Sequence, residues 1–261
     1  MTKAMITAVL LFMTAGCGEA HGPDARTLGR GLHTGSPNER VHAAIALERL
    51  GRRAAPALEQ MVSYLESPAA TETAGDQIVI ALGNIGPAAA SSVPALVKFS
   101  ARTRSTFGPT QVVRSLGRIG AEPQLAVPCI AELLDRGLVQ VFVAGRALAS
   151  FGSEARGAVS AILRQLRRQE ISGIDEVELL RALAAVGPDA RDAVPLLTRR
   201  VGDPDRDGEE LLATVNALRA IGEAARASLP ALRQMQAKLL ADGREPVLRQ
   251  AVKETIASIE R

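Results

Sequence analysis

The sequence has very few aromatic residues and no strong charge of one sign. Only 2% of its 261 residues are aromatic, with no Trp and a single Tyr. Aromatic side chains are the usual anchors of tight protein interfaces, so that kind of interface is not expected. The 31 basic and 28 acidic residues nearly balance, for a formal net charge of +3. This balance does not favour a nucleic-acid partner, which attracts proteins with a marked basic excess.

Histidine and cysteine are also scarce. The three histidines, His21, His33 and His42, all precede residue 43, and the two cysteines are Cys17 and Cys129. A metal site needs clustered His, Cys or carboxylate ligands, and a reactive Cys needs a nearby base. We therefore predict no metal, no cofactor and no catalytic residue. Cys129 is expected to be a small core side chain.

The sequence does contain one motif that is repeated six times, and each copy is centred on a glycine. The glycines are Gly51, Gly86, Gly120, Gly152, Gly187 and Gly222, with steps of 35, 34, 32, 35 and 35 residues. A large apolar residue directly precedes each glycine, and a leucine stands four residues before it. These spacings mark one face of an α-helix, and the glycine suits a left-handed C-cap. A Pro or Ser usually follows eight residues later and is predicted to begin a second helix.

Each repeat is thus a helical pair, in which a helix A leads through a glycine turn to a helix B. Neither helix can bury its apolar face alone, so the pairs are expected to stack. Residues 25–33 and 246–260 are predicted to be the terminal capping helices. The repeated Ala-Leu-x-x-Ile-Gly and the later Val-Pro-x-Leu resemble HEAT repeats, most closely the short bacterial kind related to phycobilin lyases. The expected fold over 25–261 is all-α, a right-handed α-solenoid of about six HEAT-like helical pairs.

The resemblance implies a binding scaffold, because most proteins of this superfamily are scaffolds and only a few are enzymes. Deoxyhypusine hydroxylases bind iron through His-Glu pairs, and this chain has no His-Glu dipeptide. A bilin cleft or the basic groove of a HEAT-like DNA glycosylase would call for aromatic walls, which are lacking here. The leading prediction is a non-catalytic protein-interaction scaffold. There are two alternatives. One is a HEAT-type enzyme or enzyme subunit resembling a bilin lyase, and the other is a purely structural spacer.

The N-terminal segment differs in kind from the repeats. It reads MTKAMITAVLLFMTAGC, with one lysine, an apolar run and small residues before Cys17. This is the layout of a secretory signal peptide. Its end resembles the lipobox of bacterial lipoproteins, although Thr14 stands where that family usually has an aliphatic residue. We predict a signal peptide at 1–16, a lipidated Cys17, a tether over 17–24 and attachment to the bacterial cell envelope. Free secretion is the alternative.

The segment from Asp203 to Gly208 matches the start of an EF-hand loop, D-x-D-x-D-G. Its twelfth position is Thr214 rather than the bidentate Glu, and its eighth is Glu210 rather than an aliphatic residue. We interpret these carboxylates as an inter-repeat turn that leads into the N-terminus of a helix, where negative charge is favourable.

The candidate binding residues lie on the B helices, which line the concave wall of HEAT-like solenoids. Counted from the opening Pro or Ser, the positions four and eight residues on share one helix face. In the first repeat this count selects Gln60 and Tyr64, and acidic residues occur at Glu132 and Asp203. The cations at these positions predict a basic stripe that binds an acidic segment of a protein partner: Lys98, Arg102, Arg136, Arg164, Arg168, Arg199 and Lys238.

Overall fold

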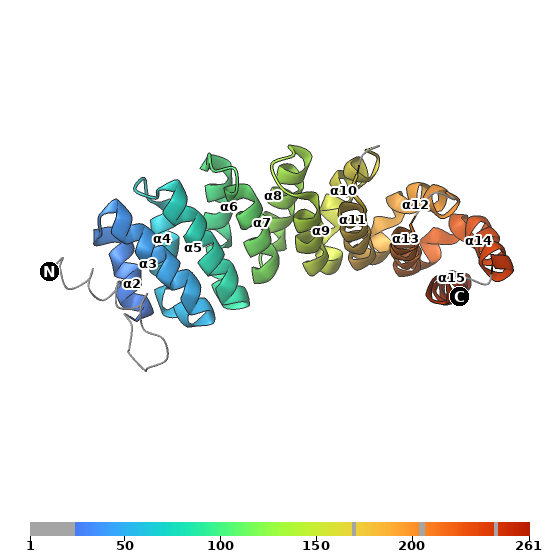
Figure 1. Ribbon diagram of the computed structural model, residues 1–261, viewed down its shortest axis with the longest axis horizontal. Coiled ribbons are helices and arrows are strands. Elements are labelled where there is room, and N and C mark those ends of the chain that lie inside the picture. The colour runs from blue at the N-terminus through green and yellow to red at the C-terminus, as the bar shows by residue number, and fades with distance from the viewer. Residues whose placement is uncertain (1–23, 169–170, 204–206, 243–244) are drawn as a thin grey trace. The chain divides into compact units, whose positions relative to one another are not determined.

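The computed structural model describes residues 24–168, 171–203, 207–242 and 245–261, and every regular element in these ranges is a helix. The chain forms two compact units, the first ending at Glu122 and the second beginning at Pro123. Figure 1 shows each unit as a row of antiparallel helical pairs. The predicted signal peptide, the lipidated Cys17 and most of the tether lie outside the described residues.

The first unit begins with the predicted capping helix and continues with helical pairs. Its helices are α2 (Ala25–Thr34), α3 (Pro37–Leu50), α4 (Leu58–Glu66), α5 (Glu72–Ile85), α6 (Val93–Arg102) and α7 (Gly108–Ile119). The 3₁₀ segments η1 (Gly51–Ala57) and η2 (Gly86–Ser92) join the two helices within a pair, α3 to α4 and α5 to α6. Helix α3 starts at a capping box, in which Ser36 and Glu39 bond each other's backbone N–H.

The second unit repeats this pattern and ends with the predicted closing helix. Its α-helices are α8 (Pro123–Asp135), α9 (Val141–Ser150), α10 (Val159–Leu166), α11 (Gly173–Val186), α12 (Val194–Val201), α13 (Gly208–Ile221), α14 (Leu229–Asp242) and α15 (Pro246–Glu260). The connecting 3₁₀ segments are η3 (Gly152–Ala158), η4 (Gly187–Ala193) and η5 (Gly222–Ser228). The all-α repeat fold predicted from the sequence is therefore confirmed.

The turn glycines all have positive φ, but most differ from the predicted left-handed C-cap. Gly120, at φ 62° and ψ 27°, adopts the left-handed helical conformation, whereas Gly51, Gly86, Gly187 and Gly222 do not. Gly187 is typical of the others, with φ 72° and ψ −136°. That region of backbone conformation is open essentially to glycine alone. It sends the chain into a 3₁₀ segment before helix B rather than directly into the helix.

The third repeat departs from the predicted start of its B helix. Helix α8 begins at Pro123, so Pro128 lies inside it instead of opening it. After Gly120, the positive φ of Glu122 (49°) lets the chain enter the helix early. No 3₁₀ segment forms in this repeat, which has the shortest step to the next glycine, 32 residues.

The core is built from the repeated apolar positions and from close approaches between A helices. The leucine four residues before each glycine is fully buried: Leu47, Leu82, Leu116, Leu148, Leu183 and Leu218. Cys129 is also buried, as predicted. A methyl group on Gly145 of α9 would lie 2.8 Å from the backbone carbonyl carbon of Glu178 on α11. The missing side chain at Gly145 is thus what lets these two helices pack closely.

Within the described residues, Glu72–Arg102 is long and apolar enough to cross a membrane by length and composition. This stretch consists of α5, η2 and α6, and the chain turns at Gly86 within it. Its large apolar side chains, among them Ile78, Leu82 and Leu96, are buried in the first unit. Its composition is accordingly that of core helices.

Candidate binding surface

The exposed face of the B helices is best located by counting from the turn glycine. In the first repeat the proline, Pro56, comes three residues earlier than in the other repeats. Counting from it therefore shifts the first repeat onto a different helix face. Tyr64, predicted to line the groove, is instead fully buried, and its hydroxyl lies 3.4 Å from the carbonyl oxygen of Ala69. Gln60 likewise turns toward α2, since its side chain lies against Gly29.

Counted from glycine, the residue thirteen positions on is buried in every repeat. These residues are Tyr64, Phe99, Leu133, Gln165, Arg200 and Met235. The positions twelve and sixteen residues after the glycine flank this buried column, and we call them the open-face positions. They are Ser63, Ser67, Lys98, Arg102, Glu132, Arg136, Arg164, Arg168, Arg199, Asp203, Gln234 and Lys238. All seven predicted cations belong to this set, whereas Gln60 and Tyr64 do not.

In the first unit, both predicted cations already have partners. The Nζ of Lys98 lies 2.9 Å from Glu66 Oε1 on the preceding B helix, α4. Arg102 donates to the carbonyl oxygen of Leu65, and its guanidinium lies 5.8 Å from the centre of the Phe99 ring. Lys98 and Arg102 thus stabilise the contact between α4 and α6.

Two of the five predicted cations in the second unit are also paired. Arg164 forms a bidentate ion pair with Asp135 at the end of α8, donating hydrogen bonds of 2.9 and 2.5 Å to its two carboxylate oxygens. These bonds raise the pKa of Arg164 above its ordinary value. Arg136 bonds Glu132, one turn earlier in its own helix region, at 3.2 Å. The predicted stripe is therefore interrupted by internal neutralisation.

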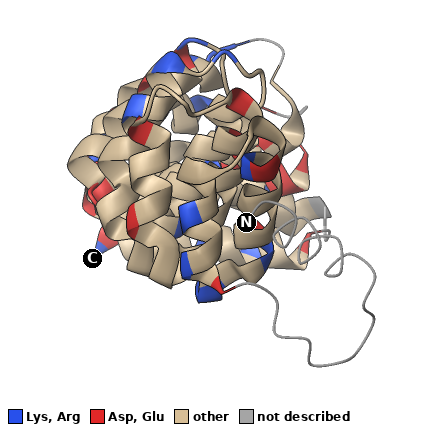
Figure 2. Cartoon of the chain, turned by 90° about the vertical axis from the view of Figure 1, so that its left-hand side faces the viewer, with Lys and Arg blue, Asp and Glu red and all other residues tan. Residues whose placement is uncertain are grey.

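The remaining three cations are exposed and pair with none of the described residues. They are Arg168, which follows α10, Arg199 on α12 and Lys238 on α14. Arg167, which the sequence prediction did not select, is exposed and unpaired in the same way. All four lie in the second unit, so the unpaired cations at and beside the open-face positions are concentrated there. Basic and acidic positions are otherwise interspersed along the helices (Figure 2).

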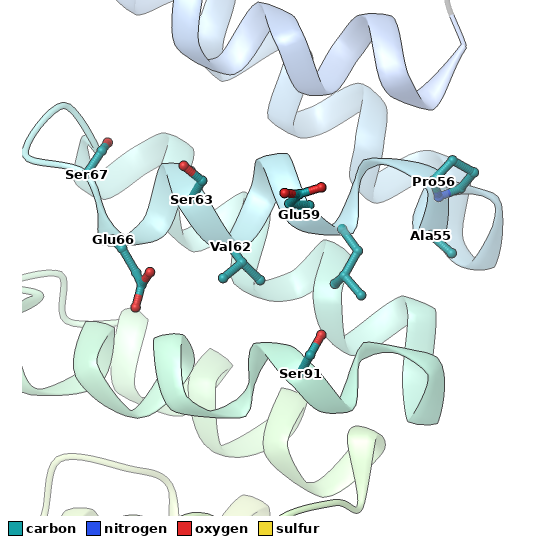
Figure 3. A pocket seen from close by; sticks show the side chains of 9 residues that line it. Ala55, Pro56, Glu59, Val62, Ser63, Glu66, Ser67 and Ser91 are labelled. Atoms are coloured by element: carbon teal, nitrogen blue, oxygen red, sulfur yellow. The ribbon is translucent and has the colours of Figure 1, made fainter.

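The first unit has an open groove where its own open-face positions carry serines. This groove has a volume of about 760 Å³ and includes Glu59, Val62, Ser63, Glu66 and Ser67 in its lining. Val62 and Glu66 point from α4 toward the next repeat, and Ser91 faces them from η2 (Figure 3). The small serines leave the groove open, and its polar side chains are hydroxylic and acidic rather than basic, beside apolar ones such as Leu58 and Val62.

A second hollow, of about 320 Å³, lies on the A-helix side of the second unit. Its lining includes the buried carboxylate of Glu178, which accepts hydrogen bonds from Arg146 at 3.0 Å and Arg181 at 2.8 Å. The two guanidinium groups compensate the desolvation of this carboxylate. The arrangement ties α9 to α11.

The described residues contain no group of three or more His, Cys, Asp or Glu side chains placed to hold a metal ion. In the EF-hand-like segment, residues 204–206 lie outside the described ranges. Asp207 is the N-cap of α13, and its side chain accepts from the backbone N–H of Glu209 at 2.9 Å. This is the helix-start role that we expected for the carboxylates of that segment.

No protein-family model matches the sequence, and no curated protein matches it either. Solved structures do resemble it in fold. An engineered protein aligns with a TM-score of 0.66 and 21% identity over 91% of this chain and 68% of its own. The complex of CpcE and CpcF of phycocyanin lyase from Nostoc sp. PCC7120 aligns with a TM-score of 0.53 and 18% identity, over 94% and 99% of the two chains. At these identities the likeness establishes a HEAT-like helical repeat fold.

Proposed function

We propose that the protein is a non-catalytic scaffold that holds an acidic segment of a partner protein on the open face of its second unit. The observation that carries this proposal is the division among the seven predicted cations. Four are engaged internally, whereas Arg168, Arg199 and Lys238 are exposed without an ion pair among the described residues. An acidic partner would neutralise them and bind faster through electrostatic steering.

We also propose that the scaffold is tethered to the bacterial envelope by lipids on Cys17. The apolar run and the small residues before Cys17 support this part. Two or more acyl chains give a stable anchor, whereas one gives only marginal binding. Mass spectrometry of the N-terminal peptide tests the tether. An acylated Cys17 supports it, and an unmodified N-terminus after ordinary signal cleavage contradicts it.

Crosslinking of the full-length protein in its native cells tests the scaffold function. The test variant reverses three charges, Arg168→Glu, Arg199→Glu and Lys238→Glu. The control makes the same charge change at exposed residues away from the open face, through Arg114→Glu, Arg191→Glu and Lys253→Glu. We expect the wild type and the control to crosslink to an acidic segment of one partner, with the test variant losing it. Equal crosslinking by all three proteins would exclude the open face.

The alternative of an enzyme or enzyme subunit rests on the fold likeness to phycocyanin lyase. The same experiment separates the two functions. A scaffold keeps its partner in a stable complex with no change in the partner's mass. A partner that is released with a covalent modification, lost in the test variant, would favour the enzyme instead.

A further inference from the structure

Two pairs of neighbouring B helices, α4 with α6 and α8 with α10, meet in the same register, which their ion pairs reveal. In the first unit, Lys98 stands twelve residues after its turn glycine and pairs with Glu66, fifteen residues after the preceding glycine. In the second unit, Arg164 and Asp135 occupy the same two positions and pair in the same way. Each pair therefore joins a cation on one B helix to a carboxylate at the end of the helix before it.

The next step of the second unit keeps this register. Gln165 on α10 donates to the carbonyl oxygen of Leu134 on α8, at 3.1 Å. One repeat later, Arg200 on α12 donates to the carbonyl oxygen of Leu166 on α10. Gln165 and Arg200 both stand thirteen residues after their glycines, and their acceptors both stand fourteen residues after the preceding ones. Helix α12 therefore meets α10 as α10 meets α8.

This register places two arginines opposite each other. Arg199 stands twelve residues after its glycine, the position that Arg164 has in the repeat before. Arg167 stands fifteen residues after its glycine, the position that Asp135 has in the repeat before. Arg199 accordingly faces Arg167, where Arg164 faces a carboxylate. Both arginines are exposed, and neither pairs with a described residue. Positive charge at a helix C-terminus is favourable for each alone, but two facing guanidinium groups repel each other.

We infer that Arg167 and Arg199 form a receptor for one carboxylate, supplied by an Asp or Glu side chain of the partner. This inference rests on the proposed function and specifies one contact within it. A carboxylate fits because the two equivalent positions are filled by Glu66 and Asp135 of the chain itself. Guanidinium groups bind carboxylates through paired, charge-assisted hydrogen bonds, and Arg164 already shows this geometry with Asp135.

The test introduces a carboxylate of the protein itself opposite Arg199, so that the partner's carboxylate is no longer needed there. Arg167→Asp supplies the carboxylate that two other repeats have at this position, Glu66 and Asp135, so Arg199 is expected to pair with it as Arg164 pairs with Asp135. The probe is a fluorescent peptide of alternating Glu and Gly residues, measured by anisotropy at low salt. We expect Arg167→Asp to weaken binding about tenfold or more, the loss of one charge-assisted contact. Arg191→Asp carries the same charge change on an exposed residue of η4 and is expected to bind within about twofold of the wild type.

A gain-of-function variant makes the test independent of any loss of folding. Asp135→Arg places a second arginine opposite Arg164, and we expect it to strengthen binding of the same peptide. Equal loss in Arg167→Asp and Arg191→Asp, or no gain in Asp135→Arg, would overturn the receptor. Displacement of the peptide by equimolar inorganic phosphate would overturn the preference for carboxylate. If the peptide results hold but crosslinking in cells finds no partner, the scaffold function fails while the receptor stands.

Discussion

Arg200 is buried against the carboxylate of Glu176, with side chains 5% and 2% exposed. It occupies the column that holds Tyr64, Phe99, Leu133 and Met235 in other repeats. A charged residue thus replaces an apolar one in the core, and Glu176 on α11 provides the opposite charge. The pair fixes α12 against α11, and the bond from Arg200 to Leu166 fixes it against α10.

Removal of one member of this pair is expected to destabilise the protein strongly. Glu176→Ala leaves a guanidinium buried without its carboxylate, a change that costs about 3–5 kcal/mol in other proteins. The double variant Glu176→Leu with Arg200→Met places apolar side chains at both positions. Its free energy of unfolding is expected to be within about 1.5 kcal/mol of that of the wild type. Urea unfolding followed by circular dichroism measures both. A double variant as unstable as Glu176→Ala would show that the pair is not the cause.

The turn glycines differ in how much a side chain should cost. Gly187, at φ 72° and ψ −136°, has a conformation that only glycine adopts easily, so Gly187→Ala is expected to cost about 1–3 kcal/mol. Gly120 is in the left-handed helical region, which asparagine tolerates. Gly120→Asn is therefore expected to cost less than Gly187→Asn. Urea unfolding of the two Asn variants compares them, and equal costs would contradict the conformational argument.

Asp76 is expected to make the free energy of unfolding depend on pH in the acidic range. Burial is the main cause that raises the pKa of Asp76 above its ordinary value of 3.8. Ser105 donates to Asp76 Oδ2 at 2.6 Å, while Oδ1 is buried with no hydrogen-bond partner among the described residues. Because the folded pKa exceeds the unfolded one, ionisation of Asp76 opposes folding above the folded pKa. This cost is relieved as the pH falls toward 3.8.

Asp76→Asn removes this titration and serves as the reference for the wild type. The free energy of unfolding of the wild type, relative to Asp76→Asn, is expected to increase as the pH is lowered from 7 toward about 4. Chemical unfolding of both proteins across that range gives the difference directly. A difference that stays constant, or that moves in favour of the variant on acidification, would contradict a raised pKa in the folded protein.

The repeated motif centred on glycine was sufficient to predict the fold, because it contains both the buried leucines and the turns. The terminal helices were also predictable, since 25–33 and 246–260 continue the apolar pattern without the full motif. The exposed face was harder to predict. Proline begins a B helix only approximately, so counting from Pro56 placed the buried Tyr64 in the groove.

The pairing state of each cation depends on which residue of the preceding helix lies opposite. That relation requires the register between repeats, which the contacts of Gln165 with Leu134 and of Arg200 with Leu166 reveal. Counting from the glycine would have shown one signal in advance. Gln165 and Arg200 are an amide and a charged side chain in a column that otherwise holds Tyr64, Phe99, Leu133 and Met235.

The register also predicts opposite effects for one substitution made at two equivalent positions. Arg164→Glu places two carboxylates opposite each other, Glu and Asp135, and is expected to lower the free energy of unfolding. Arg199→Glu places a carboxylate opposite Arg167 and is expected to be neutral or stabilising by about 0.5 kcal/mol. The two variants have the same net charge, so a general charge effect cancels in the comparison. Urea unfolding at low salt measures the difference, which should shrink near 1 M salt because exposed charges are screened. If Arg199→Glu destabilised the protein as much as Arg164→Glu does, Arg167 would not lie opposite Arg199, and the carboxylate receptor would have no structural basis.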